Sequence, residues 1–367
     1  MSFFDLPPII ERMLLVSDKI SDLNFSVGQL PQVEINGKLT PVQPLGLQKL
    51  TPYQTEIIAM TLLQENPEAA DRLVKTGTAD LSYSLPSRAR FRCNIFQQRG
   101  VYSIVMRVIP TDIPSLASLV LPSQLSEIAE LRNGLVLITG PTGSGKSSTL
   151  AAIIDIINET KHYHVVAIED PIEYLHTHKN STINQREVGH DTKDFPSALR
   201  AALRQAPKVI LIGEMRDVET IETAMEAAET GHLVLSTLHT IDAAETINRI
   251  IDFFPPHEQK QVRLALAGAL RGIICQRLVP RADGQGRCVA MEICVATGRI
   301  ADAIADPDKT HSIGELIKEG AYYGMQTFDQ HLVALIRDGV ITLEAAMAAS
   351  TSPHDLTVEL RQAGLTM

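Results

Sequence analysis

The residues of this chain best suited to chemistry follow an unbroken apolar run, Leu135–Ile138, and read GPTGSGKS. This is the pattern G-x-x-x-x-G-K-[ST], whose glycines let backbone N–H groups close around phosphate oxygens. Lys146 can then reach the β- and γ-phosphates of a nucleotide, and the Ser147 hydroxyl can bind Mg²⁺. The predicted nucleotide-binding residues are Gly140, Pro141, Thr142, Gly143, Ser144, Gly145, Lys146, Ser147 and Ser148.

The residues around this loop predict the elements that must position it. The apolar run is typical of a strand buried on both faces of a parallel sheet. Leu150, Ile153 and Ile157 recur at helical spacing, and the N-terminus of such a helix adds partial positive charge beside a phosphate. A glycine-rich turn without a ligand is the alternative. Eight matched positions between a strand and a helix favour a nucleotide site.

Acidic residues follow two further predicted strands. Glu214 comes directly after the buried run Lys208–Gly213, where a Walker-B-type carboxylate meets Mg²⁺ or the attacking water. A helix-capping carboxylate is the alternative for Glu214. Glu169 and Asp170 follow a short predicted strand, and either one can orient water or metal while the other braces the loop. The sequence leaves their separate roles open.

Two histidines flank the predicted strand LVLSTL seven residues apart. This odd spacing places His232 and His239 on opposite faces of a strand, so they are not expected to point at one phosphate together. His239 lies at the carboxyl end and can donate to the γ-phosphate, whereas His232 is predicted to be structural. Because ligands bind beyond the carboxyl ends of parallel strands, we expect the glycine loop, the acidic residues and His239 to meet at one edge.

Arginines crowd the last two predicted strands before residue 110. They are Arg88, Arg90, Arg92, Arg99 and Arg107. A solvated strand face is the ordinary explanation. A guanidinium supplied by a second domain or subunit can instead stabilise transition-state charge, and the sequence leaves both interpretations open.

Composition limits the remaining classes of protein. The 367 residues are long for one core, and 44% apolar with 21% charged residues is ordinary for a globular protein. A formal charge of −10 argues against a general nucleic-acid binder, so no nucleic-acid partner is expected. The N-terminus lacks signal-peptide features and no apolar run could span a bilayer, which predicts a cytosolic protein. The four cysteines form no C-x-x-C pair, so we expect reduced, mostly buried thiols and no zinc site.

The order of predicted elements indicates an α/β fold with a smaller α+β domain in front and a helical region behind. The predicted parts are residues 1–112, a linker over 113–122, a P-loop domain over 123–300 and a helical region over 301–367. In the first part we expect a hairpin turn at Asn36-Gly37 and a helix that begins at Thr51-Pro52. From about Pro255 the chain is predicted to be largely helical, with a strand at Arg287–Val295.

The chain resembles the PilT/PilU retraction family of type IV pilus secretion ATPases, within the GspE/VirB11-like superfamily, over nearly its whole length. The resemblance rests on these segments, in order: SDLNFSVG, RARFRCNIF, GPTGSGKSSTLA, AIEDPIEY, NQREVG, VILIGEMRD, AAETGHLVLSTLHT, CQRLVP and GMQTFDQ. AIEDPIEY matches the family's Asp box, VILIGEMRD its Walker B segment and GHLVLSTLHT its His box.

By that resemblance Glu214 is the catalytic glutamate, Glu169 a supporting acid and His239 the histidine linked to the γ-phosphate. Arg92 and Arg107 match two arginines of the N-terminal domain that approach the nucleotide in related motors. The implied cofactors are ATP and Mg²⁺, with Ser147 and Glu214 at the metal. The resemblance also implies a PAS-like first domain, a RecA-like second domain and a homohexamer. Such a ring acts on a platform protein at the inner membrane, with which it associates peripherally.

The chain departs from the family pattern at several points. Asn24 stands where the SDLHLS stretch has histidine, LRQAPK replaces the commoner L-R-x-D-P-D, and GRIADAI at 298–304 replaces the PilT motif AIRNLI. No tetracysteine insert is present, which favours retraction over extension. The LRQAP, GMQTFDQ and SPHDL segments are similar to PilU. The sequence therefore leaves open a motor that retracts pili alone and an accessory to a paralogous retraction ATPase.

Other classes of function also stay open at this point. A related secretion or pilus-assembly ATPase would share the same core, and a nucleotide-gated subunit would bind ATP without turnover. Glu214, Glu169 and His239 together argue against a pure switch. A RecA-like helicase fits the core fold but not the acidic charge.

Overall fold

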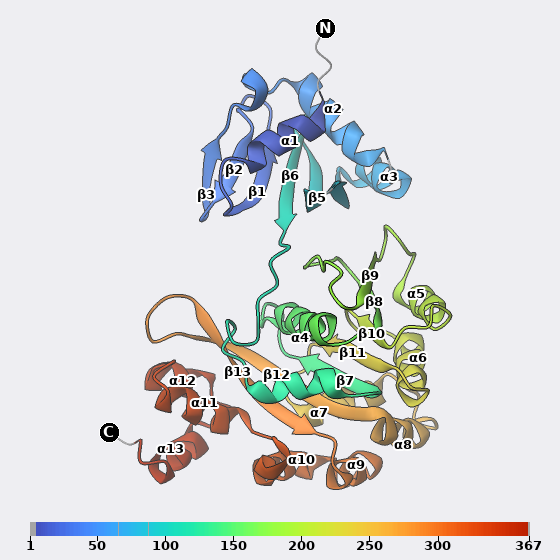
Figure 1. Ribbon diagram of the computed structural model, residues 1–367, viewed down its shortest axis with the longest axis vertical. Helices are drawn as coiled ribbons and strands as arrows, with labels where there is room; N and C mark the ends of the chain where they lie inside the picture. The colour runs from blue at the N-terminus through green and yellow to red at the C-terminus, as the bar shows by residue number, and fades with distance from the viewer. Residues whose placement is uncertain (1–4, 65, 87, 366–367) are drawn as a thin grey trace. The chain divides into compact units, whose positions relative to one another are not determined.

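The computed structural model describes residues 5–64, 66–86 and 88–365, which form two compact units (Figure 1). The first unit contains the residues up to Asp112 together with Pro171–Leu175. The second contains Ile113–Asp170 and the residues from His176 onward. The predicted linker, 113–122, carries no helix or strand. No helix in the described part of the chain is long and apolar enough to cross a membrane.

A six-stranded antiparallel sheet and three α-helices make up the first unit. The strand order is β3-β2-β1-β6-β5-β4. The strands are β1 Ile20–Phe25, β2 Gln32–Ile35, β3 Lys38–Pro41, β4 Thr78–Leu85, β5 Ala89–Gln98 and β6 Val101–Ile109. The helices are α1 Leu6–Leu14, α2 Pro52–Leu63 and α3 Pro67–Thr76, with a 3₁₀ turn, η1, at Pro44–Gly46. The predicted α+β arrangement is confirmed.

Local signals explain where elements of this unit begin and turn. Asn36 and Gly37 both have positive φ, 52° and 75°, as a two-residue hairpin turn requires. Thr51 accepts a hydrogen bond from the Gln54 backbone N–H, while the Gln54 side chain accepts from the Thr51 N–H. This reciprocal cap satisfies two backbone donors at the start of α2. Both predicted features are confirmed.

A seven-stranded sheet organises the second unit, in the order β13-β12-β7-β11-β10-β8-β9. Only β13 runs antiparallel to its neighbour. The strands are β7 Gly134–Thr139, β8 His164–Glu169, β9 Thr182–Glu187, β10 Val209–Ile212, β11 Leu233–Leu238, β12 Leu270–Pro280 and β13 Arg287–Val295. Every residue of β7 is buried, as its apolar run predicted.

Helices cover both faces of this sheet and continue beyond it. They are η2 Ser123–Glu130, α4 Lys146–Thr160, α5 Phe195–Ala202, α6 Val218–Glu229, α7 Ala243–Asp252, α8 Gln259–Ala269, α9 Gly298–Ala305, η3 Thr310–Ser312, α10 Ile313–Glu319, η4 Gly320–Tyr323, α11 Phe328–Arg337, α12 Leu343–Ala349 and α13 Pro353–Gln362. The helical C-terminal region is therefore confirmed.

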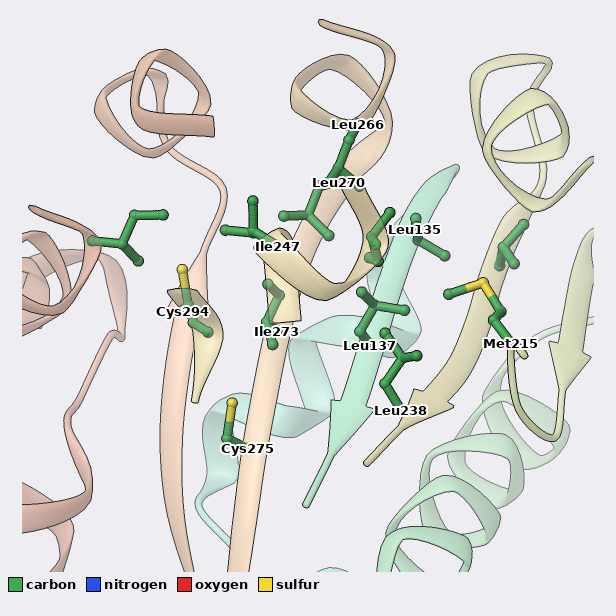
Figure 2. Packing of buried hydrophobic residues seen from close by; sticks show 14 of the residues in the cluster. Leu135, Leu137, Met215, Leu238, Ile247, Leu266, Leu270, Ile273, Cys275 and Cys294 are labelled. Atoms are coloured by element: carbon green, nitrogen blue, oxygen red, sulfur yellow. The ribbon is translucent and has the colours of Figure 1, made fainter. Parts of the chain in front are cut away.

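Alternating residues of the central strands feed two separate apolar clusters. Leu135 and Leu137 of β7 belong to the cluster under α6, α7 and α8, where Figure 2 shows them near Leu266 and Leu270. Val136 and Ile138 belong to the cluster under α4 and η2. Each such side chain stabilises the fold by about 2 kcal/mol relative to its exposure to water. The sheet edge is thus held by packing on both faces.

Two strands escaped the sequence prediction. The stretch after Pro255 was predicted to be largely helical, and this is wrong for β12, which lies between β7 and β13. Helix α8 ends at Ala269 and β12 begins at Leu270, so no turn residues mark the change. Strand β9 was also missed, because TINQRE at the sheet edge is mostly polar.

A β-bulge lies at the start of β12. Leu270 pairs with Leu135 and Gly272 with Val136, so Arg271 is one extra residue on this strand. Because a bulge shifts the alternation of side chains, the residues before and after it change faces. Leu270, Ile273 and Cys275 consequently share the cluster under α8.

Candidate functional site

The sheet order brings the predicted functional residues to one edge. Strands β7, β11, β10 and β8 are successive parallel neighbours. Their carboxyl ends carry the glycine loop, His239, Glu214 and Glu169, respectively. The strand pattern predicted this convergence from the rule that parallel strands end at a common edge.

Two glycines of the loop have conformations that side chains would not allow. Gly140 has φ 140°, and a Cβ there would lie 2.3 Å from the backbone oxygen of Gln276. Gly145 has φ 91°, and a Cβ there would lie 3.3 Å from Gln276 Nε2. Strand β12 therefore packs closely against the loop. Only glycine fits at Gly140, and any other residue at Gly145 would strain the backbone there.

Helix α4 begins at Lys146 directly after Gly145, which is its N-cap and has no side chain to accept from the first N–H groups. Those groups and the helix dipole give this end partial positive charge. A phosphate is the kind of ligand that such an end binds. The arrangement fits the predicted role of the loop.

Lys146 is buried, with 9% of its surface exposed. Its ammonium donates to the carbonyl oxygens of Gly140 at 2.8 Å and Pro141 at 3.2 Å, and it lies 3.4 Å from His239 Nδ1. The positive charge is thereby held over the loop, within reach of phosphate oxygens bound there.

His239 lies between a positive and a negative group. Its Nδ1 faces Lys146, and its Nε2 lies 3.5 Å from Glu214 Oε2. Because an ammonium can only donate, the contact with Lys146 requires a lone pair on Nδ1. The tautomer with its proton on Nε2 satisfies both contacts, because Nε2 then donates toward the Glu214 carboxylate. By contrast, His232 Nδ1 donates to Ala227 O at 3.0 Å, the structural role predicted for it.

Glu214 is mostly enclosed, with its side chain 14% exposed. Its carboxylate also pairs with the Arg216 guanidinium. The preceding residue, Gly213, packs so tightly that a Cβ there would lie 3.3 Å from the Cα of Glu169. The ends of β10 and β8 are therefore in close contact, which places both carboxylates at the same corner.

Glu169 is held by a hydrogen-bonded chain that the sequence did not predict. Gln185 Nε2 on β9 donates to Glu169 Oε1 at 2.9 Å, and Gln185 Oε1 accepts from the His176 backbone N–H at 3.0 Å. Asp170 is exposed. Glu169 is thus the better-anchored carboxylate of the two.

Arg92 and Arg107 lie in the first unit, directly opposite each other on β5 and β6. Arg107 Nε donates to Asp22 Oδ1 at 3.0 Å, and the Asp22 carboxylate is 7% exposed. Both arginines are on an exposed face of that sheet. Their predicted approach to the nucleotide stays a prediction.

The residues present also fit Mg²⁺. No group of three or more His, Cys, Asp or Glu side chains that could hold a metal exists in the part of the chain that the structure describes. Mg²⁺ does not need one, because it binds through one or two protein oxygens together with phosphates and waters. Ser147 in the first turn of α4 and Glu214 at the next-but-one strand end can supply those oxygens.

Gln276 is the loop contact that sequence reasoning missed. It is fully buried, and its Nε2 donates to Ser144 O at 2.7 Å. One signal could have found it, because a glutamine interrupts the apolar stretch IIC-Q-RLV. Buried glutamines are rare without a partner.

Behind the loop lies a buried carboxylate. Glu292 on β13 is opposite Cys275, which is opposite Thr139 at the end of β7. Burial raises the pKa of Glu292 to about 7, although its Oε1 accepts from the Ala243 backbone N–H at 2.9 Å. Burial also raises the pKa of the Cys275 thiol well above its usual range. All four cysteines are buried.

Comparison with known proteins links this geometry to characterised ones. Residues 47–350 match the model of the family described as "Type II/IV secretion system protein". A Pseudomonas aeruginosa protein described as "Type IV pilus retractation ATPase PilT" is 40% identical over 94% of this chain and 99% of its own length. "Type IV pilus ATPase PilU" of the same organism is 40% identical over 95% of this chain and 90% of its own.

A solved structure extends the likeness to three dimensions. The pilus retraction motor PilT with bound ADP matches with a TM-score of 0.84 and 44% identity, covering 96% of this chain and 99% of that one. The predicted α/β fold class of a RecA-like ATPase is thereby confirmed.

Proposed function

Because the chain belongs to the type II/IV secretion system protein family, we propose that it is an ATP-hydrolysing motor that drives type IV pilus retraction. The observation that carries this proposal is the line from Lys146 through His239 to Glu214 at the glycine loop. It joins the group that neutralises phosphate charge to the group that orients water. A protein that only bound nucleotide would not need the second.

In this proposal the protein positions and neutralises, since phosphoryl transfer needs little covalent help. The loop N–H groups and Lys146 bind the phosphates, and Ser147 and Glu214 hold Mg²⁺. When bound, Mg²⁺ supplies charge neutralisation at the β- and γ-phosphates. Glu214 orients the attacking water, with Glu169 as the supporting acid. His239 detects the γ-phosphate, because its two nitrogens face Lys146 and Glu214.

The motor is proposed to be a homohexamer in the cytoplasm that acts on an inner-membrane platform protein of the pilus. Arg92 and Arg107 then stabilise transition-state charge from the N-terminal domain. ATPase activity should accordingly depend on assembly. Each cycle converts the nucleotide state into rotation of one domain against its neighbour.

Pilus retraction is favoured over secretion or assembly, because relatives named for the pilus match nearly the full length of this chain. The equal identity to PilT and to PilU supports, in second place, an accessory role beside a paralogous retraction ATPase. A deletion strain separates these possibilities. Loss of twitching with excess fibres supports retraction, whereas a block of a secreted product supports secretion.

Hydrolysis is tested by steady-state ATPase assays of the full chain. Lys146→Ala and Glu214→Gln should each lower turnover roughly a hundredfold or more, because each removes a charge that acts in the transition state. Glu214→Gln should keep its ADP affinity, whereas Lys146→Ala should lose it. Glu222→Gln, on the exposed side of α6, is the matched control. Turnover near that of the wild type in both site variants would end the proposal, and tight binding without turnover in the wild type would indicate a switch.

A further inference from the structure

Gln276 lies against both ends of the glycine loop. Its backbone oxygen lies against Gly140, and its amide nitrogen lies against Gly145 and donates to Ser144 O. It follows Cys275, the last residue of β12 that pairs with β7. Strand β12 continues to Pro280, and Gln276 is its first residue beyond the pairing with β7, where the strand packs against the loop.

The hydrogen bond to Ser144 O fixes the orientation of a peptide group. Because a peptide is planar and trans, a carbonyl that points at Gln276 forces the following N–H, that of Gly145, to point the opposite way. This is the side of the loop away from β12. N–H groups on that side are the ones that can meet a phosphate.

The alternative orientation of this peptide is open to glycine. A flip would change φ of Gly145 from 91° to about −90°, an allowed value for any residue. The flipped group would present the Ser144 carbonyl oxygen where an N–H should be, and the oxygen would repel phosphate. The Ser144 N–H is already committed to Pro141 O at 3.1 Å. Gln276 is thus placed to hold this peptide.

The environment of Gln276 indicates that the amide is kept for this contact. The side chain is fully buried, and its Oε1 has no hydrogen-bond partner among the described residues. An unpaired buried carbonyl destabilises a fold, so an apolar side chain would be better for stability alone. Turning the amide over would set Oε1 against Ser144 O, two acceptors, so the donor must face the loop.

We propose that Gln276 is a positioning residue whose amide holds the Ser144–Gly145 peptide in its phosphate-binding orientation and so sets nucleotide affinity. The inference rests on the proposed nucleotide binding at this loop. Gln276 touches no reacting atom and acts only through the loop. Its loss should therefore weaken binding more than it slows the chemical step.

The chain supplies a matched control. Gln326 is half-buried, and like Gln276 it donates from Nε2 to a backbone carbonyl, that of Met291, at 3.2 Å. It lies in the same unit but contacts β13 rather than the loop. Gln326→Met removes the same chemistry at a place that should not affect nucleotide.

The experiment titrates the full chain with a fluorescent ADP analogue and measures KM and kcat for ATP. Gln276→Met, which keeps volume but loses the donor, should weaken ADP about tenfold, as expected for one buried hydrogen bond. KM should rise while kcat changes little, and Gln326→Met should bind like the wild type. Gln276→Glu should bind weakly at pH 8 and recover relative to the wild type toward pH 6, because only the protonated carboxyl can donate to Ser144 O.

The results separate two failures. If the wild type binds no ADP, the proposed function fails. If the wild type binds, Lys146→Ala does not, and Gln276→Met and Gln276→Glu bind like the wild type at both pH values, only the role of Gln276 is overturned. An equal loss in Gln276→Met and Gln326→Met also overturns it. Should Gln276→Met not fold, the pH response of Gln276→Glu decides alone.

Discussion

Helices α4, α5, α6 and α7 each follow a strand of the second sheet (Figure 1). Their N-termini are capped in different ways. Helices α5, α6 and α7 each have an aspartate at the N-cap, and each aspartate accepts from the backbone N–H of the third helical residue. Helix α4 has Gly145 there and no side-chain cap. Three of the four helix ends are thus capped by the carboxylate of the residue that precedes the helix.

The fold gives up stability for binding at the N-terminus of α4. An aspartate cap contributes about 1 kcal/mol relative to a residue that cannot accept. Helix α7 has a second carboxylate, because Glu292 accepts from its first N–H. Helix α4 forgoes both contributions, and its N–H groups stay available to an anion from outside the chain. Changing one helix end at a time tests this contrast.

Adding a carboxylate at the uncapped N-terminus of α4 should have the largest effect, which is on nucleotide binding. Gly145→Asp would place a carboxylate where phosphate is expected, on a backbone with positive φ, and should weaken ADP binding by roughly a hundredfold or more. Gly145→Ala carries the backbone strain without the charge and should lose less affinity. Isothermal titration with ADP measures both. Equal losses would show that strain, rather than occupation of the helix end, decides binding.

The N-terminus of α7 is capped by both Asp242 and Glu292. Changing Glu292 should alter how the stability of the fold depends on pH. The pKa of Glu292 is about 7 in the folded chain, above its ordinary 4.5, so the folded state binds the extra proton. Its stability therefore falls as pH rises from about 4.5 to about 7.

Glu292→Gln removes this titration and keeps an acceptor for Ala243. The variant should match the wild type near pH 4.5 and be more stable at pH 8 by about 3 kcal/mol. Urea unfolding at the two pH values measures the difference. A constant difference at both pH values would contradict the assigned titration.

Removing the aspartate cap of α6 should have the smallest effect. Asp217 accepts from both the backbone N–H and the hydroxyl of Thr220 at 2.8 Å. Asp217→Ala should lower the free energy of unfolding by about 1 kcal/mol. The extra stability conferred by saturating ADP should not change, since α6 is not the helix that holds phosphate. Asp217→Asn, which can still accept, should behave like the wild type in thermal unfolding.

Sequence reasoning succeeded where a local signal is sufficient. Thr51 and Pro52 mark the start of α2, and the strand predicted at Arg287–Val295 has those bounds as β13. The glycine loop was readable because its chemistry requires a contiguous motif. Such features depend on neighbours in the chain.

The missed features depend on partners that are distant in the chain. Gln276 lies 132 residues from Ser144 in the sequence. Strand β12 begins directly after α8, so no turn residues between them indicate that a strand follows. The contact of His239 with Lys146 spans 93 residues. Spacing could place these groups at one edge but could not show that the imidazole bridges two charges.

The bulge at Arg271 has a consequence for the loop. Along an uninterrupted strand, residues 270 and 276 are an even number apart and would share a face. The extra residue inverts this parity, so Leu270 joins the cluster under α8 while Gln276 turns to the side of α4. Without the bulge, Leu270 and Gln276 would lie on the same face. Either Leu270 would leave the cluster under α8, or the Gln276 amide would not reach Ser144 O. One extra residue at the start of β12 thus lets the same strand pack a leucine against α8 on one face and hold the glycine loop on the other.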